Sequence, residues 1–438
     1  MAYIQYAKGG TDYRTKGTIS CWVKRSSTGV QQDIWSWGEN NSSDAYLRFD
    51  TADNIEINCD GAGTSYNSTT LYRDNNAWYH FVFSLDGSNA TANLRRRFWI
   101  NGVQQDEGQG SINAFSAAVF GWHSTQDLWI GARARSQQGG DIESFDGLMS
   151  HFHYCSNHSY AASDFGSFDS TTGEWKINTT PNVQYGSEGF FLKMEDSSNL
   201  DLDSSGNNKT LTTTGTITAT KDCPSNVFTT LNSLSTYKGS LNFSNGNLTM
   251  TTDGGGASWT SRWGVSNLGM VSGKYYAEAK VVDIGSNQMY ALGLCKDVGT
   301  FTPSSSVAAA GNNGLGYYST GNIYTGGAFG NESNDQTSLA TYTTNDIIGL
   351  AFDRTNGTAQ WYKNGSAIGS AVTGLSTDGV WFFVSNFYNT GTVSLNFGNG
   401  VFGTTAVSSA GTNASNNGIF EYDVPANYTA LSTKGLNL

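Results

Sequence analysis

The chain has 438 residues, of which 24 are Lys or Arg and 36 are Asp or Glu, so its formal net charge is −12. A negative chain has no basic field that would attract a phosphate backbone, and we expect no nucleic-acid partner. Charged residues make up only 14% of the sequence and aromatic residues 13%, while glycine occurs 53 times. This composition leaves little material for amphipathic helices and supplies strands and turns, so it predicts an all-β protein.

The lengths of the apolar runs and the spacing of the cysteines indicate whether the chain crosses a membrane or binds zinc. No apolar run approaches the roughly 18 residues that a membrane helix needs, so we expect no membrane insertion. The N-terminus has no charged-then-apolar signal segment, and we expect no secretory leader. An odd number of cysteines without CxxC spacing argues against a disulfide framework and a zinc site. We expect buried free thiols at these positions, Cys21, Cys59, Cys155, Cys223 and Cys295.

Alternating apolar residues predict half-buried strands in both halves of the chain. Odd positions are apolar in segments 19–23, 79–85, 275–281 and 393–397. Turn signals such as Asn101-Gly102 separate such segments. Half-buried strands with short turns are typical of antiparallel β-sandwiches.

One strand can be assigned an inner and an outer face from its flanking turns. Asn-Gly dipeptides at 356–357 and 364–365 bracket the segment Thr358–Lys363. Alternation then places Ala359 and Trp361 on the same face. We predict that Trp361 points into the core of the second sandwich.

Composition divides the chain into two sandwiches with a joint between them. The stretch 197–236 begins as a polar, aromatic-free run, and we expect it to be a linker. It separates a sandwich over 1–196 from a second one over 237–400. The remaining segment, 401–438, regains aromatic residues near its end, and we expect it to dock on the second sandwich.

Ordered groups of motifs in the two halves resemble two known families. The first 195 residues resemble a laminin-G-like, concanavalin A-like jelly roll through Ile19–Arg25 (ISCWVKR), Trp78–Ser84 (WYHFVFS), Phe98–Val103 (FWINGV), Leu128–Gly131 (LWIG) and Phe145–Met149 (FDGLM). The second half resembles a SPRY domain through Gly273–Val281 (GKYYAEAKV), Leu292–Cys295 (LGLC), Gly314–Tyr318 (GLGYY), Asp346–Asp353 (DIIGLAFD), Trp361–Gly365 (WYKNG) and Leu395–Gly398 (LNFG). These resemblances imply two antiparallel β-sandwiches.

The connecting segments resemble those of tailed-phage virion proteins, especially marine ones. The resemblance lies in 159–176, 187–208, 223–232 and 420–437. It implies a component of the virion surface, on the head or the tail, such as a tail fibre, a spike or a capsid appendage. The partners that it implies are other virion proteins and further copies of this chain in a homo-oligomer.

Catalysis by a concanavalin A-like fold would need two carboxylates that face one cleft. On one strand this requires acids at positions i and i+2. The pairs with that spacing lie in a glycine-rich loop, in the linker and in the terminal tail, namely Asp141/Glu143, Asp201/Asp203 and Glu421/Asp423. We interpret them as solvated surface acids and expect no enzymatic activity; no GxSxG elbow occurs either.

The sequence requires no cofactor, and calcium is the candidate metal. His151 and His153 share a strand face, but Phe152 and Tyr154 would then fill the core and leave both imidazoles outside. Laminin-G-like sandwiches often hold calcium between loop oxygens. That resemblance offers Asp60 and Asp146 as oxygen donors.

Aromatic residues on loops at the sandwich rim are candidates for stacking on sugars. Trp35 and Trp37 are better explained by core packing. The candidates for ligand binding lie beside glycine-rich turns and are Trp122, Trp259, Arg262, Trp263 and Tyr324.

Together these features predict a non-enzymatic virion surface protein that adheres to host-surface glycans. Several copies on a particle would compensate for weak single sites. A purely structural decoration protein that acts by protein–protein docking is an alternative, and a glycan depolymerase is a second one.

Overall fold

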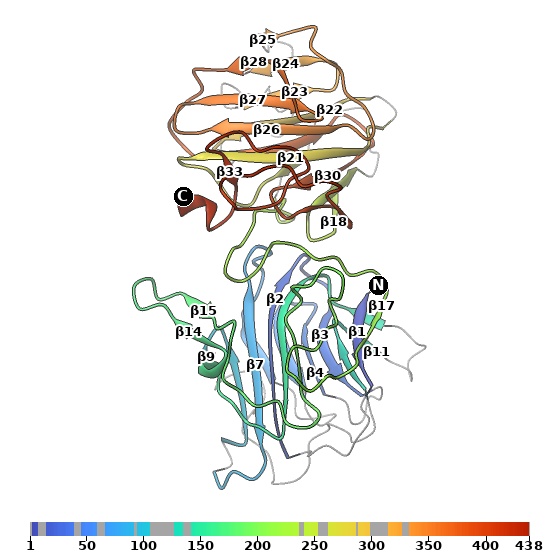
Figure 1. Ribbon diagram of the computed structural model, residues 1–438, viewed down its shortest axis with the longest axis vertical. Coiled ribbons are helices and arrows are strands. Elements are labelled where there is room, and N and C mark those ends of the chain that lie inside the picture. Colours follow the sequence, from blue (N-terminus) through green and yellow to red (C-terminus); the bar gives the residue numbers. More distant parts are fainter. Residues whose placement is uncertain are drawn as a thin grey trace. The chain divides into compact units, whose positions relative to one another are not determined.

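The computed structural model describes residues 2–7, 15–38, 45–58, 66–91, 94–105, 127–134, 142–235, 241–252, 262–285, 288–297, 314–325 and 333–437. The chain divides into two compact units, Met1–Ala219 and Thr220–Leu438. Each unit is built from sheets of mainly antiparallel strands (Figure 1), and within the described ranges the helices are short 3₁₀ turns, so the all-β prediction is confirmed. None of the helices in these ranges has the length and apolarity that crossing a bilayer requires.

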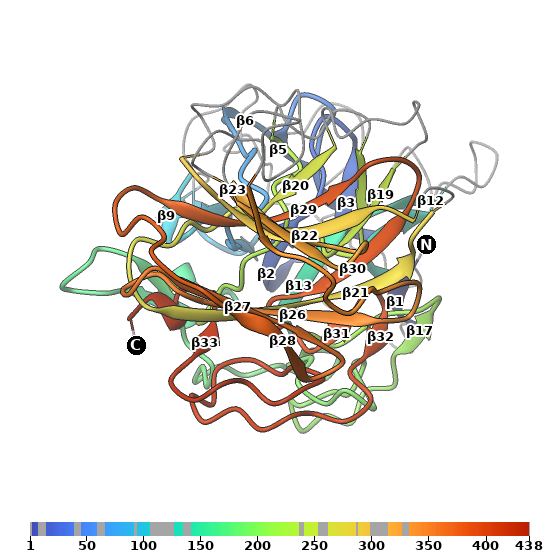
Figure 2. The ribbon, with the colours of Figure 1, turned by 90° about the horizontal axis from the view of Figure 1, so that it is seen from above.

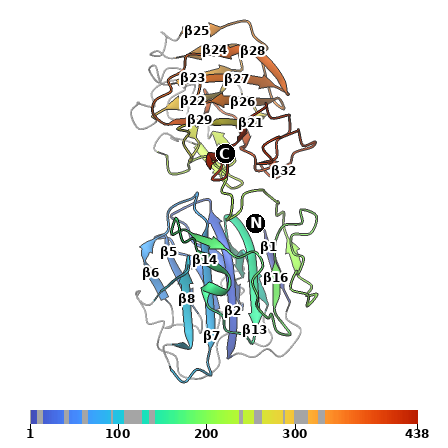
Figure 3. The same ribbon diagram turned by 60° about the vertical axis from the view of Figure 1, so that its left-hand side comes forward.

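The first unit is a sandwich of a seven-stranded and a six-stranded sheet. The seven-stranded sheet has the order β17 (Thr212–Thr214), β1 (Tyr3–Tyr6), β10 (Leu128–Ile130), β3 (Gln32–Trp37), β4 (Ala45–Phe49), β5 (Asn54–Asn58) and β6 (Tyr66–Leu71). The six-stranded sheet, whose central strands run side by side in Figure 3, has the order β16 (Phe190–Leu192), β13 (Gly147–Ser156), β2 (Lys16–Arg25), β7 (Tyr79–Asp86), β8 (Arg96–Ile100) and β9 (Val103–Gln104). Two hairpins accompany them, β11 (Ala132–Ala134) with β12 (Ile142–Ser144), and β14 (Gly166–Phe168) with β15 (Trp175–Ile177).

The core of the first unit follows the predicted alternation. Ile19 lies opposite Phe83 and Cys21 opposite Phe81 across β2 and β7, and all four side chains are buried in one cluster. Trp35 joins the same cluster. Removing these side chains from water drives the pairing of the two sheets. The thiols of Cys21, Cys155 and Cys295 are free and buried, that of Cys223 is free and half-buried, and Cys59 lies outside the described residues.

The outer face of the six-stranded sheet is also buried. Residues 157–189, which include the 3₁₀ turn η3 (Ala162–Asp164), pack on it through Phe165 and Trp175. Phe152 and Tyr154 point into the sandwich core, as predicted, so His153 faces this second layer. Burial lowers the pKa of His153 well below its usual value, and Nδ1 lies 2.9 Å from the Tyr185 hydroxyl.

The second unit is a sandwich of similar design. Its larger sheet has the order β18 (Leu241–Ser244), β19 (Thr249–Thr252), β30 (Thr392–Asn396), β21 (Lys274–Asp283), β26 (Ile347–Asp353), β27 (Thr358–Lys363) and β28 (Ser366–Val372), with β33 (Thr429–Ala430) beside β21. The other sheet has the order β20 (Trp263–Val265), β29 (Trp381–Phe387), β22 (Tyr290–Lys296), β23 (Gly314–Tyr318), β24 (Asn322–Thr325) and β25 (Ser333–Gln336). A short pair, β31 (Val401–Phe402) with β32 (Thr405–Ala406), and the turn η8 (Gly435–Asn437) follow.

Trp361 lies in the core between these two sheets. Its side chain is completely buried, and its indole N–H donates to the carbonyl oxygen of Leu292 at 3.0 Å. Ala359 shares this face and is buried too. The inward orientation predicted for Trp361 is therefore confirmed.

The C-terminal segment covers the outer side of the larger sheet of this unit (Figure 2). β33 pairs in parallel with β21, and Phe420 packs on Tyr276 with ring centroids 5.1 Å apart. The buried carboxylate of Glu278 accepts hydrogen bonds from the backbone N–H groups of Glu421 at 2.8 Å and Tyr422 at 2.9 Å. A buried acceptor thus holds the segment in register.

The structure differs from the expected linker at 197–236. Residues 212–214 form β17, which pairs with β1, and Leu211 packs against the first core. Asn207 donates from its side chain to the backbone oxygens of Gly186 and Gly189 at 2.6 and 2.8 Å. From Thr220 onward the chain belongs to the second unit. The polar side chains that suggested a linker instead bond the main chain of ordered loops.

Candidate functional site

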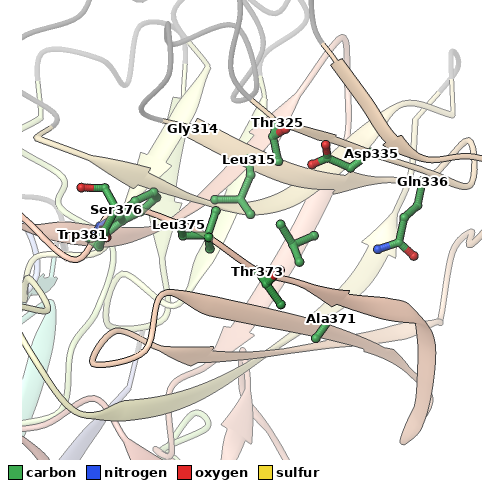
Figure 4. A pocket seen from close by; sticks show the side chains of 12 residues that line it. Gly314, Leu315, Thr325, Asp335, Gln336, Ala371, Thr373, Leu375, Ser376 and Trp381 are labelled. Atoms are coloured by element: carbon green, nitrogen blue, oxygen red, sulfur yellow. The ribbon is translucent and has the colours of Figure 1, made fainter.

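An open pocket of about 490 Å³ lies in the second unit where the last strands of its two sheets face each other (Figure 4). β25 ends one sheet and β28 ends the other. Pockets of this size suit small ligands. Its lining residues are Gly314, Leu315, Thr325, Asp335, Gln336, Ala371, Val372, Thr373, Gly374, Leu375, Ser376 and Trp381.

A β-bulge places Asp335 at this pocket. In the pairing of β24 with β25, Ile323 lies opposite Gln336 and Tyr324 opposite Asn334, so Asp335 has no partner residue. The side chain of such an unpaired residue does not follow the regular alternation between the two faces of the sheet. The carboxylate of Asp335 therefore lies at the pocket, next to Thr325 (Figure 4).

A second irregularity shapes the opposite edge. Ala359 pairs with Val372 and Trp361 with Ile368, so residues 369–371 of β28 lie opposite a single residue of β27. Gly369 has a φ of +61°, a conformation that favours glycine, and a Cβ there would overlap the side-chain oxygen of Gln336.

Gln336 joins the two edges. Its side-chain nitrogen donates to the carbonyl oxygen of Ser370 at 2.6 Å, and its side-chain oxygen accepts from the N–H of Ser370 at 2.8 Å. These two hydrogen bonds resemble the pair of backbone hydrogen bonds that a residue of a neighbouring antiparallel strand would form with Ser370. They fix the spacing of the two edges on either side of the pocket.

The groups left for a ligand are a carboxylate and hydroxyls. Asp335 is exposed, and the side chains of Asp335, Thr325 and Thr373 make no hydrogen bond to any other described residue. Trp381 is almost fully buried and donates from its indole nitrogen to the carbonyl oxygen of Ser376 at 3.0 Å. The pocket therefore offers a carboxylate and hydroxyl groups, which suits a molecule rich in hydroxyl groups.

Two of the predicted ligand-binding residues are packed side chains. Trp263 is completely buried in an apolar cluster on the sheet of β20, so its ring has no free face for a sugar. Arg262 is 3% exposed and donates to the carbonyl oxygen of Tyr388 at 2.7 Å. The prediction that these two residues form an exposed site is wrong, because Trp263 packs into a cluster with Tyr318 and Val384, and the backbone of Tyr388 binds Arg262.

Tyr324 is brought to the same cluster as Trp263. It is half-buried, and its ring meets that of Tyr318 at 5.0 Å between centroids. Its neighbour Thr325, on the other face of β24, is the residue that reaches the pocket. The predictions for Trp122 and Trp259 lie outside the described residues.

The calcium prediction gains no support from Asp146. Its carboxylate is exposed and accepts a hydrogen bond from the hydroxyl of Ser27 at 2.9 Å. The carboxylate of Asp146 interacts electrostatically with the buried guanidinium of Arg25. The positive charge of Arg25 opposes the binding of a divalent cation at Asp146. Asp60 lies outside the described residues, and the part of the chain described here holds no group of three or more metal-ligating side chains.

A pair of acids that the sequence did not predict lies on the outer face of the first unit. Asp33 of β3 is completely buried and lies beside Glu143 of β12. Burial and the neighbouring Glu143 carboxylate raise the pKa of Asp33 to about 8. Gln31 donates from its side-chain nitrogen to Glu143. Glu143 is thus no solvated surface acid, which corrects the interpretation of that residue; Asp141 lies outside the described residues.

The carboxyl pair belongs to a network of opposite charges. Arg48 of β4 lies opposite Asp33 and donates from Nε to Glu56 Oε2 at 2.7 Å. Glu56 also accepts from the hydroxyl of Tyr46 at 2.7 Å. The acids come from β3, β5 and β12, which are distant in sequence. A search for acids at i and i+2 could not find them, because strand pairing brings them together.

The remaining predicted acid pairs bond loops and edges. Asp203 accepts from the backbone N–H groups of Phe191 at 3.0 Å and Lys209 at 2.9 Å. Asp423 accepts from the N–H of Thr412 at 2.6 Å. These acceptors satisfy main-chain donors of irregular segments.

Comparison with known proteins gives a match to one family and to several solved structures. Residues 2–161 match the family model described as the Concanavalin A-like lectin/glucanases superfamily. No curated protein matches the sequence significantly. Because the match covers less than half of the chain, it describes a part of the first unit.

The solved structures that resemble this chain include SPRY domains. The SPRY domain of human HERC1 shares 21% identity over 35% of this chain and 91% of that domain, with a TM-score of 0.29. The TRIM65 PSpry domain shares 13% identity over 38% of this chain and 88% of that one, with a TM-score of 0.30. The chain is therefore an all-β protein with a concanavalin A-like match in its first unit and with SPRY domains among its structural neighbours.

Proposed function

We propose that this protein is a non-enzymatic binding protein that recognises host-surface glycans through the pocket between β25 and β28. The observation that carries the proposal is the bulge at Asp335, which aims a carboxylate into a pocket that Thr325 and Thr373 also line. Carboxylates and hydroxyls at a concave site bind the hydroxyl groups of sugars by hydrogen bonds.

The acids of the first unit support a non-enzymatic role. The paired acids of a retaining glycosidase stand about 5 to 5.5 Å apart, and those of an inverting one stand further apart. Asp33 instead has no exposed surface, and Glu143 lies beside it. A completely buried carboxyl group cannot contact a glycosidic bond.

We place the protein on the surface of a virus particle, as part of a tail fibre, a spike or a capsid appendage. The support is the resemblance of the connecting segments to those of tailed-phage virion proteins. Other virion proteins and further copies of this chain are the proposed partners. Several copies on one particle would raise the avidity of a shallow single site.

Binding of the purified chain to a glycan array, followed by calorimetric titration with the best ligand, tests this proposal. Asp335→Asn and Thr373→Val should each weaken binding about tenfold, because the first replaces a charged acceptor by a neutral amide and the second removes a hydroxyl group that bonds the ligand. Asp378→Asn is the matched control, since Asp378 is exposed in the same unit and lies outside the pocket lining.

Two outcomes would overturn the proposal. Failure to bind any glycan would leave a structural role in protein–protein docking. Release of reducing sugars from host polysaccharide by the purified chain would show a depolymerase.

A further inference from the structure

The charge of the pocket has one sign. Asp335 is the one charged residue among the twelve described residues that line it. Asp335 forms no ion pair with another residue of the described ranges. A carboxylate without a neighbouring cation favours a positively charged partner.

A basic side chain, Lys296, contacts the pocket lining at Ser376, which Figure 4 shows at the opposite end of the lining from Asp335. Lys296 donates from Nζ to the hydroxyl of Ser376 at 3.0 Å, and its Nζ lies 3.9 Å from the carboxylate of Asp297. Lys296 does not line the pocket. The ammonium group of Lys296 therefore does not neutralise the carboxylate of Asp335, which can bind a ligand at the other end of the pocket.

We propose that the pocket selects sugars that carry a free ammonium group over their N-acetylated and acidic counterparts. This inference rests on the proposed glycan binding and names the class of sugar. The ammonium group of an amino sugar would donate to the carboxylate of Asp335, and ring hydroxyls would bond Thr325 and Thr373. An acidic sugar would bring a second negative charge to the same carboxylate and be repelled.

Ionic strength separates this mechanism from hydrogen bonding alone. Asp335 is exposed, so its attraction for a charged ligand is screened by salt. Binding of the ammonium sugar should weaken as salt is added. Binding of a neutral sugar by hydroxyl contacts should change little.

The test is calorimetric titration of the full chain with three oligosaccharides of equal length: glucosamine, N-acetylglucosamine and galacturonic acid oligomers. At a pH where the amine is protonated and at low salt, the glucosamine oligomer should bind about tenfold tighter than the N-acetylated one, and the acidic one weakest. Asp335→Asn should remove the preference and its salt dependence, whereas Asp378→Asn should retain both. Melting curves of the two variants should match that of the wild type, because both carboxylates are exposed.

The outcomes distinguish this inference from the proposed function. Equal binding of the glucosamine and N-acetylglucosamine oligomers, or a preference that survives Asp335→Asn, would overturn the selectivity and leave glycan binding intact. Absence of binding to these three oligosaccharides and to every glycan of the array would overturn both.

Discussion

The environment of Asp33 depends on strand pairing, which cannot be predicted from the residues next to it in the sequence. Its carboxyl group lies completely buried between Arg48, its cross-strand partner, and Glu143 of the β11–β12 hairpin. Arg48 forms ion pairs with Glu56 and Glu143, and Arg133 lies over the ring of Tyr46. Burial first, and then the neighbouring Glu143, raise the pKa of Asp33, while Arg133 and Arg48 act in the opposite direction.

This raised pKa predicts a pH dependence for the first unit. The folded state holds the proton of Asp33 up to about pH 8, while the unfolded state releases it near its ordinary value of 3.8. The folded state thus binds more protons between these values, and the contribution of Asp33 to stability falls as the pH rises through this window.

Asp33→Asn should remove that contribution, because an amide can still donate to Glu143 and does not titrate. Chemical denaturation of the wild type and the variant across pH 4 to 9 should give a difference in unfolding free energy that grows in favour of the variant as the pH rises. A difference that stays constant with pH would show that Asp33 is ionised in the fold.

At the scale of the element, β27 shows how turns fix the face of a strand. Two Asn-Gly turns limit it to Thr358–Lys363, and the alternation between them sends Trp361 inward. Its neighbour Tyr362 is half-buried and packs toward Tyr276 under the C-terminal segment. Both faces of the strand are therefore covered, one by the opposite sheet and one by the end of the chain.

Trp361→Ala should destabilise the second unit by about 3 to 5 kcal/mol, since it removes a completely buried aromatic side chain and its hydrogen bond to Leu292. Differential scanning calorimetry should show one transition lowered and one unchanged. Ser366→Ala, at an exposed position of β28, is the control and should move neither. Two unchanged transitions with loss of adhesion would instead make Trp361 part of a ligand site.

At the scale of the whole molecule, each unit draws on segments far apart in the chain. β17 (residues 212–214) pairs with β1 and forms the edge of its sheet, and Leu211 is 8% exposed against the first core. In the second unit, the backbone N–H of Thr229 donates to the carbonyl oxygen of Leu431 at 3.0 Å, which links the two ends of that unit.

A chain that ends at residue 219 should therefore fold alone, whereas one that ends at residue 196 should be less stable by about 2 to 3 kcal/mol, from the loss of Leu211 burial alone. Urea denaturation of the two fragments measures the difference. Equal stability would mean that residues 197–219 behave as the linker that their composition suggested.

The fold class and the local inside–outside pattern could be predicted from the sequence. The alternation of apolar residues in β2, β7 and β21 predicts that Cys21, Phe81 and Ala277 lie in the core, and they do. An Asn-Gly turn is also predictable, because it depends on only four neighbouring residues. These features are local, so the sequence by itself determined them.

Only the tertiary structure decided the sites. Asp335 gains its position from a bulge in pairing with another strand, and Asp33 meets Glu143 across more than a hundred residues of chain. Trp263 beside glycine-rich sequence was expected at the surface, but its strand packs it into a cluster with Tyr318. Register, bulges and burial depend on which strands become neighbours, and this is settled by the packing of the whole unit.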